Sequence, residues 1–359
     1  MKTALVYDRV NKWGGAERVL LALHEIFPDA PLYTSVYDSK RASWAAVFPK
    51  VYSSFLQKIP FASTNHELLA PLMPIAFESF NLDEFDLVIS VTSEAAKGII
   101  TKPCTKHICY CLTPTRYLWS HYETYFKGST FKGVTWPVVD HLKRWDRIAS
   151  QRPDVMIAIS TEVQNRIKKY YDRDSEIIFP PVDTLDTTPL RSGVVNEENF
   201  FLVVSRLVPY KKVDLAIAAF NKMGVPLVIV GTGSEEGKLK RMAKENIKFV
   251  GQLTYGELAV YYKRCVALIM PQEEDFGIVA VEAQLAGTPV IAYKRGGVLD
   301  TVKDGVTGIF FPEPTVDSLV DAIKRFEKMK FKPEDCINQA RKFSKERFQK
   351  EFGKLIENI

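Results

Sequence analysis

The sequence alternates between short apolar runs and amphipathic stretches, and this alternation constrains the fold more than any other feature. In the first half, runs rich in β-branched residues occur at residues 2–8, 86–90, 107–111, 155–160 and 176–179. Residues 16–27 and 162–171 have helical periodicity. Apolar runs of this length that alternate with helices predict a parallel sheet covered by helices on both faces.

The same alternation begins again near residue 200. Further apolar runs lie at residues 200–205, 226–231, 247–251, 267–271, 289–293 and 308–311. Helical stretches separate them at residues 214–223, 235–245, 255–264 and 278–286. We therefore predict an α/β protein with two doubly wound Rossmann-like domains that face each other across a cleft. Ligands of such sheets bind at the carboxyl ends of the strands.

The domain boundaries follow from the same pattern. Residues 180–199 are rich in Pro, Thr and Asp and lack apolar periodicity, which is typical of a linker. We predict a first domain over residues 1–185, a linker over 186–199 and a second domain over 200–331. The apolar spacing after residue 332 predicts a helical segment, 332–359, that packs back on the first domain.

The composition and the net charge limit the cellular compartment and the classes of binding partner that we expect for this protein. The chain has no run of 18 apolar residues and no apolar core of a signal peptide near its first residue, so we expect a cytoplasmic protein. Five cysteines, an odd number, fit a reducing compartment rather than a disulfide framework. A net charge of +5 is too small to indicate a nucleic-acid partner.

Residues 127–152 combine basic and aromatic side chains, among them Phe131, Trp136 and Trp145. Such a segment can lie on an anionic membrane surface, which would place the protein at the inner face of the membrane. The alternative is a solvated helix face whose aromatic residues point into the core.

Glycines and cations follow three of the apolar runs. Gly14 and Gly15 stand at a strand-to-helix turn, where backbone N–H groups can approach a phosphate; a plain tight turn is the alternative. Arg206 and Lys211 follow the first apolar run of the second half, and the two cations would neutralise a diphosphate leaving group unless they are solvated surface charges. Gly233 belongs to a glycine turn whose spacing does not match a dinucleotide fingerprint.

Two glutamates dominate the stretch PQEEDFGIVAVEAQLAG, which starts at Pro271. Glu274 precedes Phe276 and Gly277, whose N–H groups would begin a helix and point into the cleft. Glu282 follows on that apolar helix, where a charged carboxylate needs hydrogen-bond donors such as ribose hydroxyls. The alternative is that Glu282 faces solvent.

Two residue groups could suggest a metal. Cys104, His107, Cys109 and Cys111 alternate along an apolar run, and Asp172 and Asp174 form an Asp-x-Asp pair. Buried strand residues and a polar turn explain these groups better, so we predict no metal site.

Together these motifs resemble glycosyltransferase family 4, the retaining enzymes of GT-B fold that use nucleotide sugars. The resemblance rests on GGAERVLLAL, SRLVPYKKVDLAIAAF, VIVGTGSE, EDFGIVAVEAQLAG and GGVLDTVKDGVTGIFF, which occur in the family's order. DLVISVTSEAAKGI and HICYCLTPTRYLW are similar to a bacterial mannosyltransferase-like subgroup that builds O-antigen and exopolysaccharide.

The resemblance implies a set of roles. It implies metal-independent transfer of a sugar, with GDP-mannose as the best guess for the donor, to a glycan or polyprenyl-diphosphate-linked oligosaccharide. The first domain would bind this acceptor and the second the nucleotide sugar. The implied catalytic residues are Glu274, Arg206 and Lys211, and the implied donor-binding residues are Gly14, Gly15, Gly233, Phe276, Gly277 and Glu282. Candidate acceptor or sugar contacts are Glu94, Lys97, Thr113, Arg116 and His121.

The sequence departs from the family at two places. Leu112 stands where many relatives have a histidine that contacts the donor sugar, and Ser93-Glu94 stands where they have Ser-His. Either His121 or Glu94 supplies the contact, or the donor differs from the usual one. Two other hypotheses stay open: a different GT-B enzyme such as a sugar-nucleotide epimerase, and a non-catalytic nucleotide-sugar-binding protein.

Overall fold

The computed structural model describes the whole chain except residues 61, 63–65, 121–131, 183–198 and 359. The chain divides into two compact units, Met1–Pro181 with Phe348–Ile359, and Val182–Arg347. We call them unit 1 and unit 2 and describe each by itself. The predicted linker, 186–199, lies outside the described residues except for Asn199.

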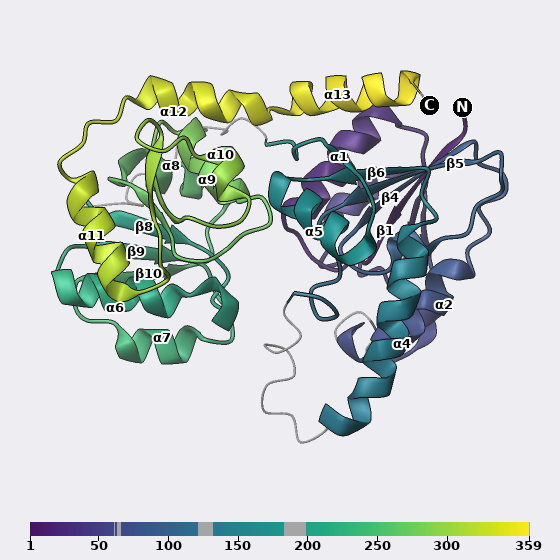
Figure 1. Ribbon diagram of the computed structural model, residues 1–359, viewed down its shortest axis with the longest axis horizontal. Coiled ribbons are helices and arrows are strands. Elements are labelled where there is room, and N and C mark those ends of the chain that lie inside the picture. The colour runs from purple at the N-terminus through teal and green to yellow at the C-terminus, as the bar shows by residue number, and fades with distance from the viewer. Residues whose placement is uncertain (61, 63–65, 121–131, 183–198, 359) are drawn as a thin grey trace. The chain divides into compact units, whose positions relative to one another are not determined.

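Unit 1 contains a parallel sheet whose strands follow the order β3-β2-β1-β4-β5-β6-β7. Figure 1 shows the strands β1, β4, β5 and β6 of this sheet together with helices of the unit. The strands are β1 (Thr3–Tyr7), β2 (Leu32–Thr34), β3 (Val51–Ser53), β4 (Leu87–Thr92), β5 (Lys106–Cys111), β6 (Val155–Ala158) and β7 (Glu176–Ile177). The helices of this unit are α1 (Gly15–Ile26), α2 (Met73–Glu78), α4 (Lys132–Ser150), α5 (Thr161–Tyr171) and most of α13 (Lys345–Glu357). The strand order reverses between β1 and β4, so the loops after these two strands emerge side by side at one edge of the sheet.

Unit 2 repeats this design with the strand order β10-β9-β8-β11-β12-β13, all pairs parallel. The strands are β8 (Phe201–Val204), β9 (Leu227–Val230), β10 (Ile247–Gly251), β11 (Leu268–Met270), β12 (Val290–Tyr293) and β13 (Gly308–Phe311). The helices are α6 (Val213–Met223), α7 (Glu236–Met242), α8 (Tyr255–Arg264), α9 (Ile278–Leu285), α10 (Val298–Thr301), α11 (Val316–Phe326) and α12 (Pro333–Ala340). Here the order reverses between β8 and β11.

Both faces of the unit 2 sheet are buried. Along β8, Phe201 and Val203 point into one apolar cluster, and Leu202 points into the cluster on the opposite face. This alternation explains why the strands read as continuous apolar runs. The prediction of two Rossmann-like α/β domains is confirmed.

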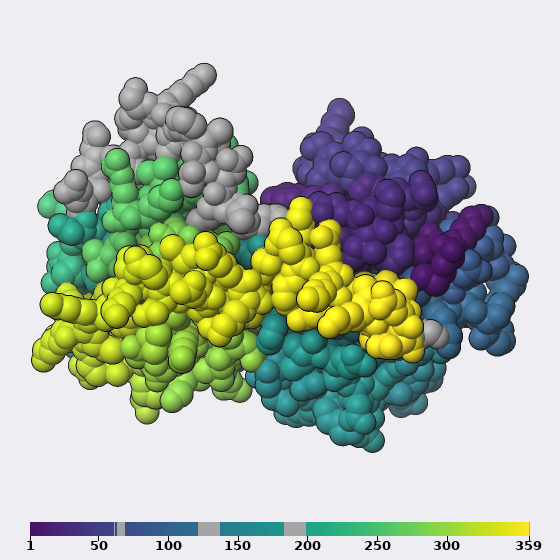
Figure 2. Space-filling view, turned by 90° about the horizontal axis from the view of Figure 1, so that it is seen from above, coloured from purple at the N-terminus to yellow at the C-terminus, as the bar shows by residue number. Residues whose placement is uncertain are grey.

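The C-terminal segment belongs to both units. Helix α12 packs against α9 in unit 2, whereas α13 from Phe348 onward packs in unit 1. There the Phe348 ring lies 5.8 Å from the Tyr110 ring of β5, and Gln349 donates a 2.8 Å hydrogen bond to Glu25 of α1. Figure 2 shows this helix, in yellow, on the surface of unit 1 between the purple N-terminal residues and a teal segment.

Across the described ranges, none of the helices combines the length and the apolar character needed to cross a bilayer.

Candidate functional site

The strand order of unit 2 brings its predicted site residues together. β8 and β11 are parallel neighbours, with Leu202 opposite Leu268. The loop after β8 carries Arg206 and Lys211, and the loop after β11 carries Glu274. Because the carboxyl ends of parallel neighbours open at the same edge, these loops meet where doubly wound sheets bind ligands.

Lys211 and Glu274 form an ion pair at this edge. The Lys211 ammonium donates to Oε1 of Glu274, and the two side chains are 13% and 16% exposed. Gln272 donates a second hydrogen bond, of 2.8 Å, to the same oxygen. The sequence predicted Lys211 as a partner of a diphosphate, and its three donors allow it to serve the carboxylate and an anion together.

The loop that carries Glu274 depends on two glycines at the start of α10. Gly297 donates its N–H to the Glu274 carbonyl at 2.8 Å. Gly296 has a φ of 81°, and a Cβ there would lie 2.3 Å from that carbonyl oxygen. Only glycine allows the backbones to approach this closely. These glycines were not among the predicted site residues, although a glycine pair is itself a signal of close backbone approach.

Phe276 and Gly277 lead from this loop into α9. Gly277 is the N-terminal cap and has a φ of 86°, which favours glycine. The Phe276 side chain is 4% exposed and its ring lies 5.5 Å from that of Phe343. The ring therefore anchors the start of α9 in the core, and any ligand contact from Phe276 must come from its backbone.

Glu282 is buried, with 3% of the residue exposed, so the solvent-facing alternative is wrong. Its Oε2 accepts a 2.8 Å hydrogen bond from the Tyr262 hydroxyl of α8, and Tyr262 is fully buried. A buried carboxylate needs such donors. Glu282 was predicted from the sequence but Tyr262 was not, because nothing in the local pattern links α8 to α9.

Arg206 is exposed on the same loop as Lys211. Its guanidinium donates to the Tyr210 hydroxyl and lies 5.9 Å from the centre of that ring. The Lys211 ammonium lies 5.4 Å from the centre of the same ring, so the two predicted leaving-group cations share Tyr210, and Lys211 in addition pairs with Glu274.

Gly233 and its neighbour Gly231 have a packing reason of their own. A Cβ at Gly231 would lie 1.9 Å from the Ser205 carbonyl oxygen, and one at Gly233 would lie 2.3 Å from that of Leu207. The loop after β9 therefore presses against the loop after β8. This close approach accounts for both glycines, and the predicted donor contact of Gly233 stays a prediction.

In unit 1, the turn at Gly14 and Gly15 begins α1. A side chain from the helix itself covers this turn: Glu17 is 1% exposed, accepts a 2.9 Å hydrogen bond from the Tyr7 hydroxyl, and has its other oxygen 3.1 Å from the position of a Cβ on Gly14. Burial raises the pKa of Glu17. A carboxylate therefore already lies beside the helix end where the sequence predicted a phosphate.

The loops after β1 and β4 are joined by Asp8. This buried carboxylate accepts hydrogen bonds from the backbone N–H groups of Ser93, Glu94, Ala95 and Ala96, at 2.6–3.0 Å. Arg9 forms an ion pair with Glu94, and both side chains are less than a fifth exposed. Glu94 therefore lies at the carboxyl edge of the sheet, held by its backbone and by a cation.

Lys97 is a buried cation that contacts the backbone of Glu94. It is 1% exposed, pairs with Asp146 of α4 at 2.6 Å and donates to the Glu94 carbonyl. Burial alone would lower the pKa of Lys97, but Asp146 outweighs it and the pKa is raised. Asp146 also accepts from Trp119 and Tyr171, both at 2.7 Å. Direct contact of Lys97 with a ligand would break this network.

The remaining sugar-contact candidates are placed differently. Thr113 is 4% exposed and accepts a 3.3 Å hydrogen bond from Arg166. Arg116 and Leu112 are both half-buried in the loop after β5. His121 lies outside the described residues.

Within the described ranges, no three His, Cys, Asp or Glu side chains are grouped so that they could hold a metal ion. His107 is fully buried, and its Nε2 lies 2.9 Å from the Ser90 hydroxyl. Cys109 and Cys111 are buried, whereas Cys104 is exposed. Packing of the buried strand β5 accounts for His107, Cys109 and Cys111, and Cys104 lies in the exposed turn before it.

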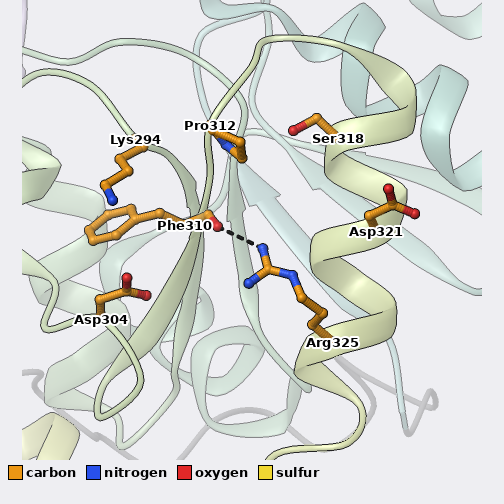
Figure 3. Close-up of a pocket in the computed structure, with 7 residues that line it drawn as sticks. All are labelled: Lys294, Asp304, Phe310, Pro312, Ser318, Asp321 and Arg325. Atoms are coloured by element: carbon orange, nitrogen blue, oxygen red, sulfur yellow. Dashed lines mark hydrogen bonds between the residues drawn. The ribbon is translucent and has the colours of Figure 1, made fainter.

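A shallow pocket of about 440 Å³ lies elsewhere in unit 2, between β13, α11 and the loop before β13 (Figure 3). It is lined by Lys294, Asp304, Phe310, Pro312, Ser318, Asp321 and Arg325. Arg325 donates to the Phe310 carbonyl at 3.0 Å, and the lining mixes both signs of charge. None of the predicted site residues lines this pocket.

Residues 187–343 match the family model described as Glycosyl transferases group 1. An uncharacterized glycosyltransferase of Methanocaldococcus jannaschii is 26% identical over 224 residues, 59% of this chain and 62% of that protein. A D-inositol 3-phosphate glycosyltransferase of Streptomyces bingchenggensis is 30% identical over 190 residues, 44% of this chain and 42% of that protein. The chain thus spans less than two thirds of either relative.

Solved structures resemble the whole chain. The crystal structure of Anabaena Alr3699/HepE in complex with UDP and glucose aligns over 100% of both chains, with a TM-score of 0.71 and 21% identity. Sucrose-phosphate synthase from Thermosynechococcus elongatus aligns over 100% of this chain and 99% of that chain, with a TM-score of 0.75 and 17% identity. These likenesses establish the GT-B fold.

Proposed function

We propose that this chain, whose residues 187–343 match a Glycosyl transferases group 1 domain, transfers a sugar from a nucleotide sugar to a glycan or lipid-linked acceptor. The observation that carries the proposal is the cluster at the carboxyl ends of β8 and β11. There Glu274, Lys211 and Gln272 form one hydrogen-bonded group, and the buried Glu282 follows on α9.

The chemistry of these side chains suggests their roles. The Glu274 carboxylate accepts hydrogen bonds and so suits hydroxyls of the transferred sugar. Lys211 supplies positive charge where a diphosphate leaves, and Glu282 suits ribose hydroxyls. Arg206 is exposed on the same loop as Lys211, and its guanidinium can turn toward a phosphate and donate two hydrogen bonds to it. We propose that these cations replace a metal ion.

For the reaction we propose a front-face displacement. The bond between the anomeric carbon and the leaving phosphate oxygen breaks while the acceptor oxygen bonds to that carbon. The acceptor proton passes to the departing phosphate oxygen. Anomeric configuration is then retained without a nucleophile from the protein, and the task of the chain is to position the donor and to stabilise charge.

The base and the sugar of the donor are the features of this proposal that a binding screen has to identify. The family resemblance implies GDP-mannose, whereas similar solved structures contain UDP and glucose, or are described as a lipopolysaccharide outer core galactosyltransferase. We propose a hexose donor and test its base and sugar together. A panel of UDP- and GDP-hexoses is screened for thermal stabilisation, since a ligand that binds only the folded state raises its stability.

Hydrolysis of the stabilising donor then separates an enzyme from a binding protein. Slow release of the nucleoside diphosphate, lost in Glu274→Gln, is expected of a transferase without its acceptor. Stabilisation with no hydrolysis and no transfer would favour the non-catalytic hypothesis, and an altered sugar still attached to its nucleotide would favour an epimerase.

We also propose peripheral contact with an anionic membrane surface through α4. Lys143 and Arg147 lie over the Trp119 ring, and Val138 and Ile148 are 42% and 62% exposed. Trp145 instead packs inward and donates to Glu78 at 2.7 Å, as the alternative expected for this residue. Phe131 and the side chain of Trp136 lie outside the described residues. Binding to anionic vesicles that weakens with salt would support the contact; salt-independent or absent binding would refute it.

A further inference from the structure

Gln272 occupies a special position beside Glu274. It lies two residues after the end of β11 and is 4% exposed. Its Nε2 donates a 2.8 Å hydrogen bond to Oε1 of Glu274, the same oxygen that accepts from Lys211. The side chain is therefore a buried member of the hydrogen-bonded group of Glu274, Lys211 and Gln272 that we propose to hold the sugar.

The neighbouring carboxylate decides which way the amide points. A carboxylate only accepts hydrogen bonds, so the NH₂ group of Gln272 must face Glu274. The amide oxygen must then point away from it. This Oε1 is buried and has no hydrogen-bond partner among the described residues. A buried acceptor left in this way destabilises the folded chain until a ligand supplies a donor.

The unpartnered Oε1 belongs to the same amide group as the Nε2 that donates to Glu274, so it lies near the Glu274 carboxylate. Glu274 and Lys211 keep 16% and 13% of their side chains exposed, so a ligand can reach this group. A ligand that donates to Glu274 would bring further donors to within reach of the amide oxygen. Two acceptors this close together suit neighbouring hydroxyls of one sugar ring, each of which donates a proton.

We infer that Oε1 of Gln272 accepts a hydrogen bond from a hydroxyl of the transferred sugar that neighbours the one held by Glu274. Gln272 is thus a specificity-determining residue for a donor sugar with two adjacent free hydroxyls. The inference rests on the proposed function of the Glu274 cluster.

The chain offers a matched control in Gln284. This glutamine of α9 is fully buried, donates to the carbonyls of Ala280 and Thr301 at 3.0 and 3.1 Å, and also has an unpartnered Oε1. It ties α9 to α10 rather than to the Glu274 carboxylate. An unpartnered oxygen is therefore not a site by itself, and what distinguishes Gln272 is its bond to Glu274.

The first experiment measures binding by calorimetry for wild type, Gln272→Met and Gln284→Met. The probes are UDP-glucose, GDP-mannose, UDP and GDP. We expect Gln272→Met to bind the better nucleotide sugar about tenfold more weakly, since about 1.4 kcal/mol is lost. Its affinity for the matching diphosphate should stay within about twofold, and Gln284→Met should change neither affinity. Gln272→Ala serves as a second variant, and circular dichroism checks that all variants are folded.

The second experiment separates direct contact from an effect through Glu274. Analogues of the bound nucleotide sugar have single hydroxyls replaced by fluorine, which cannot donate to Oε1. For wild type, the analogue altered at the contacted hydroxyl should bind about tenfold more weakly. For Gln272→Met, that analogue should bind as well as the parent sugar, because the partner oxygen is already gone.

Two negative results have different meanings. If wild type binds none of the probes, the proposed function fails and the inference fails with it. If wild type binds a nucleotide sugar and Gln272→Met keeps its affinity, or loses affinity equally for every analogue, the inference alone is overturned.

Discussion

Replacing Lys211 by methionine tests the ion pair at the centre of the site. The substitution keeps most of the aliphatic stem but removes the ammonium that donates to Glu274. Both side chains are more than four-fifths buried, so solvent replaces the lost contact poorly. The Glu274 carboxylate then keeps the Gln272 amide as its neighbouring donor.

Two losses add up in the transition state. A hydrogen bond to a charged group contributes about 1.5–3 kcal/mol, which corresponds to about 10- to 150-fold in rate if the contact is needed for transfer. Lys211 would also stabilise charge on the leaving diphosphate, and loss of one such donor costs about 100-fold or more. We therefore expect kcat to fall by at least about 100-fold in Lys211→Met.

The neighbouring Lys212 provides the matched control. It is exposed, has a φ of 52° and caps the start of α6, so its side chain points elsewhere. Single-turnover release of nucleoside diphosphate is measured for Lys211→Met and Lys212→Met with the donor identified by the panel. A loss of only a few fold for Lys211→Met, or an equal loss for both variants, would refute the role given to Lys211.

Three further predictions concern neighbouring groups. Tyr262→Phe removes the 2.8 Å donor of Glu282, and we expect diphosphate affinity to fall about tenfold by calorimetry; unchanged affinity would contradict a ribose contact positioned by this tyrosine. Gly296→Ala puts a Cβ 2.3 Å from the Glu274 carbonyl, so chemical denaturation should show a loss of more than about 1 kcal/mol, and wild-type stability would mean that the loop adapts freely. Burial, with help from nearby arginines, lowers the pKa of His107 to about 3. Because the unfolded state then binds a proton that the folded state does not, stability should fall by about 1.4 kcal/mol per unit as pH drops below about 6.5. His107→Asn should flatten that slope, and an identical slope would show that His107 is not the cause.

The fold was largely predictable because strong local patterns mark its elements. The helix predicted at residues 255–264 matches α8, where Thr254 and Glu257 form a capping box that sets its start. The strands β2 and β3 were missed because each has three residues and, unlike the equally short β11, neither lies in a longer apolar run.

The sequence marked Glu274 and Lys211 as candidate site residues, but it did not predict their contact with each other. Glu274 and Lys211 are 63 residues apart, and their contact follows from the pairing of β8 with β11, which local periodicity does not encode. The burial of Lys97 was missed for the same reason, since its partner Asp146 lies on a distant helix. No sequence pattern marks Gln272 as a site residue. It is recognised only in the folded chain, where its Oε1 is buried without a hydrogen-bond partner among the described residues.

The proposed function assigns the transferred sugar to Glu274 and the nucleotide to other residues. The most direct measurement compares wild type with Glu274→Gln for both diphosphate affinity and donor turnover in the same preparation. We expect affinity to stay within about twofold and turnover to fall by at least about 100-fold, since a key transition-state contact is lost. Full turnover in Glu274→Gln would contradict the proposed contact between Glu274 and the transferred sugar.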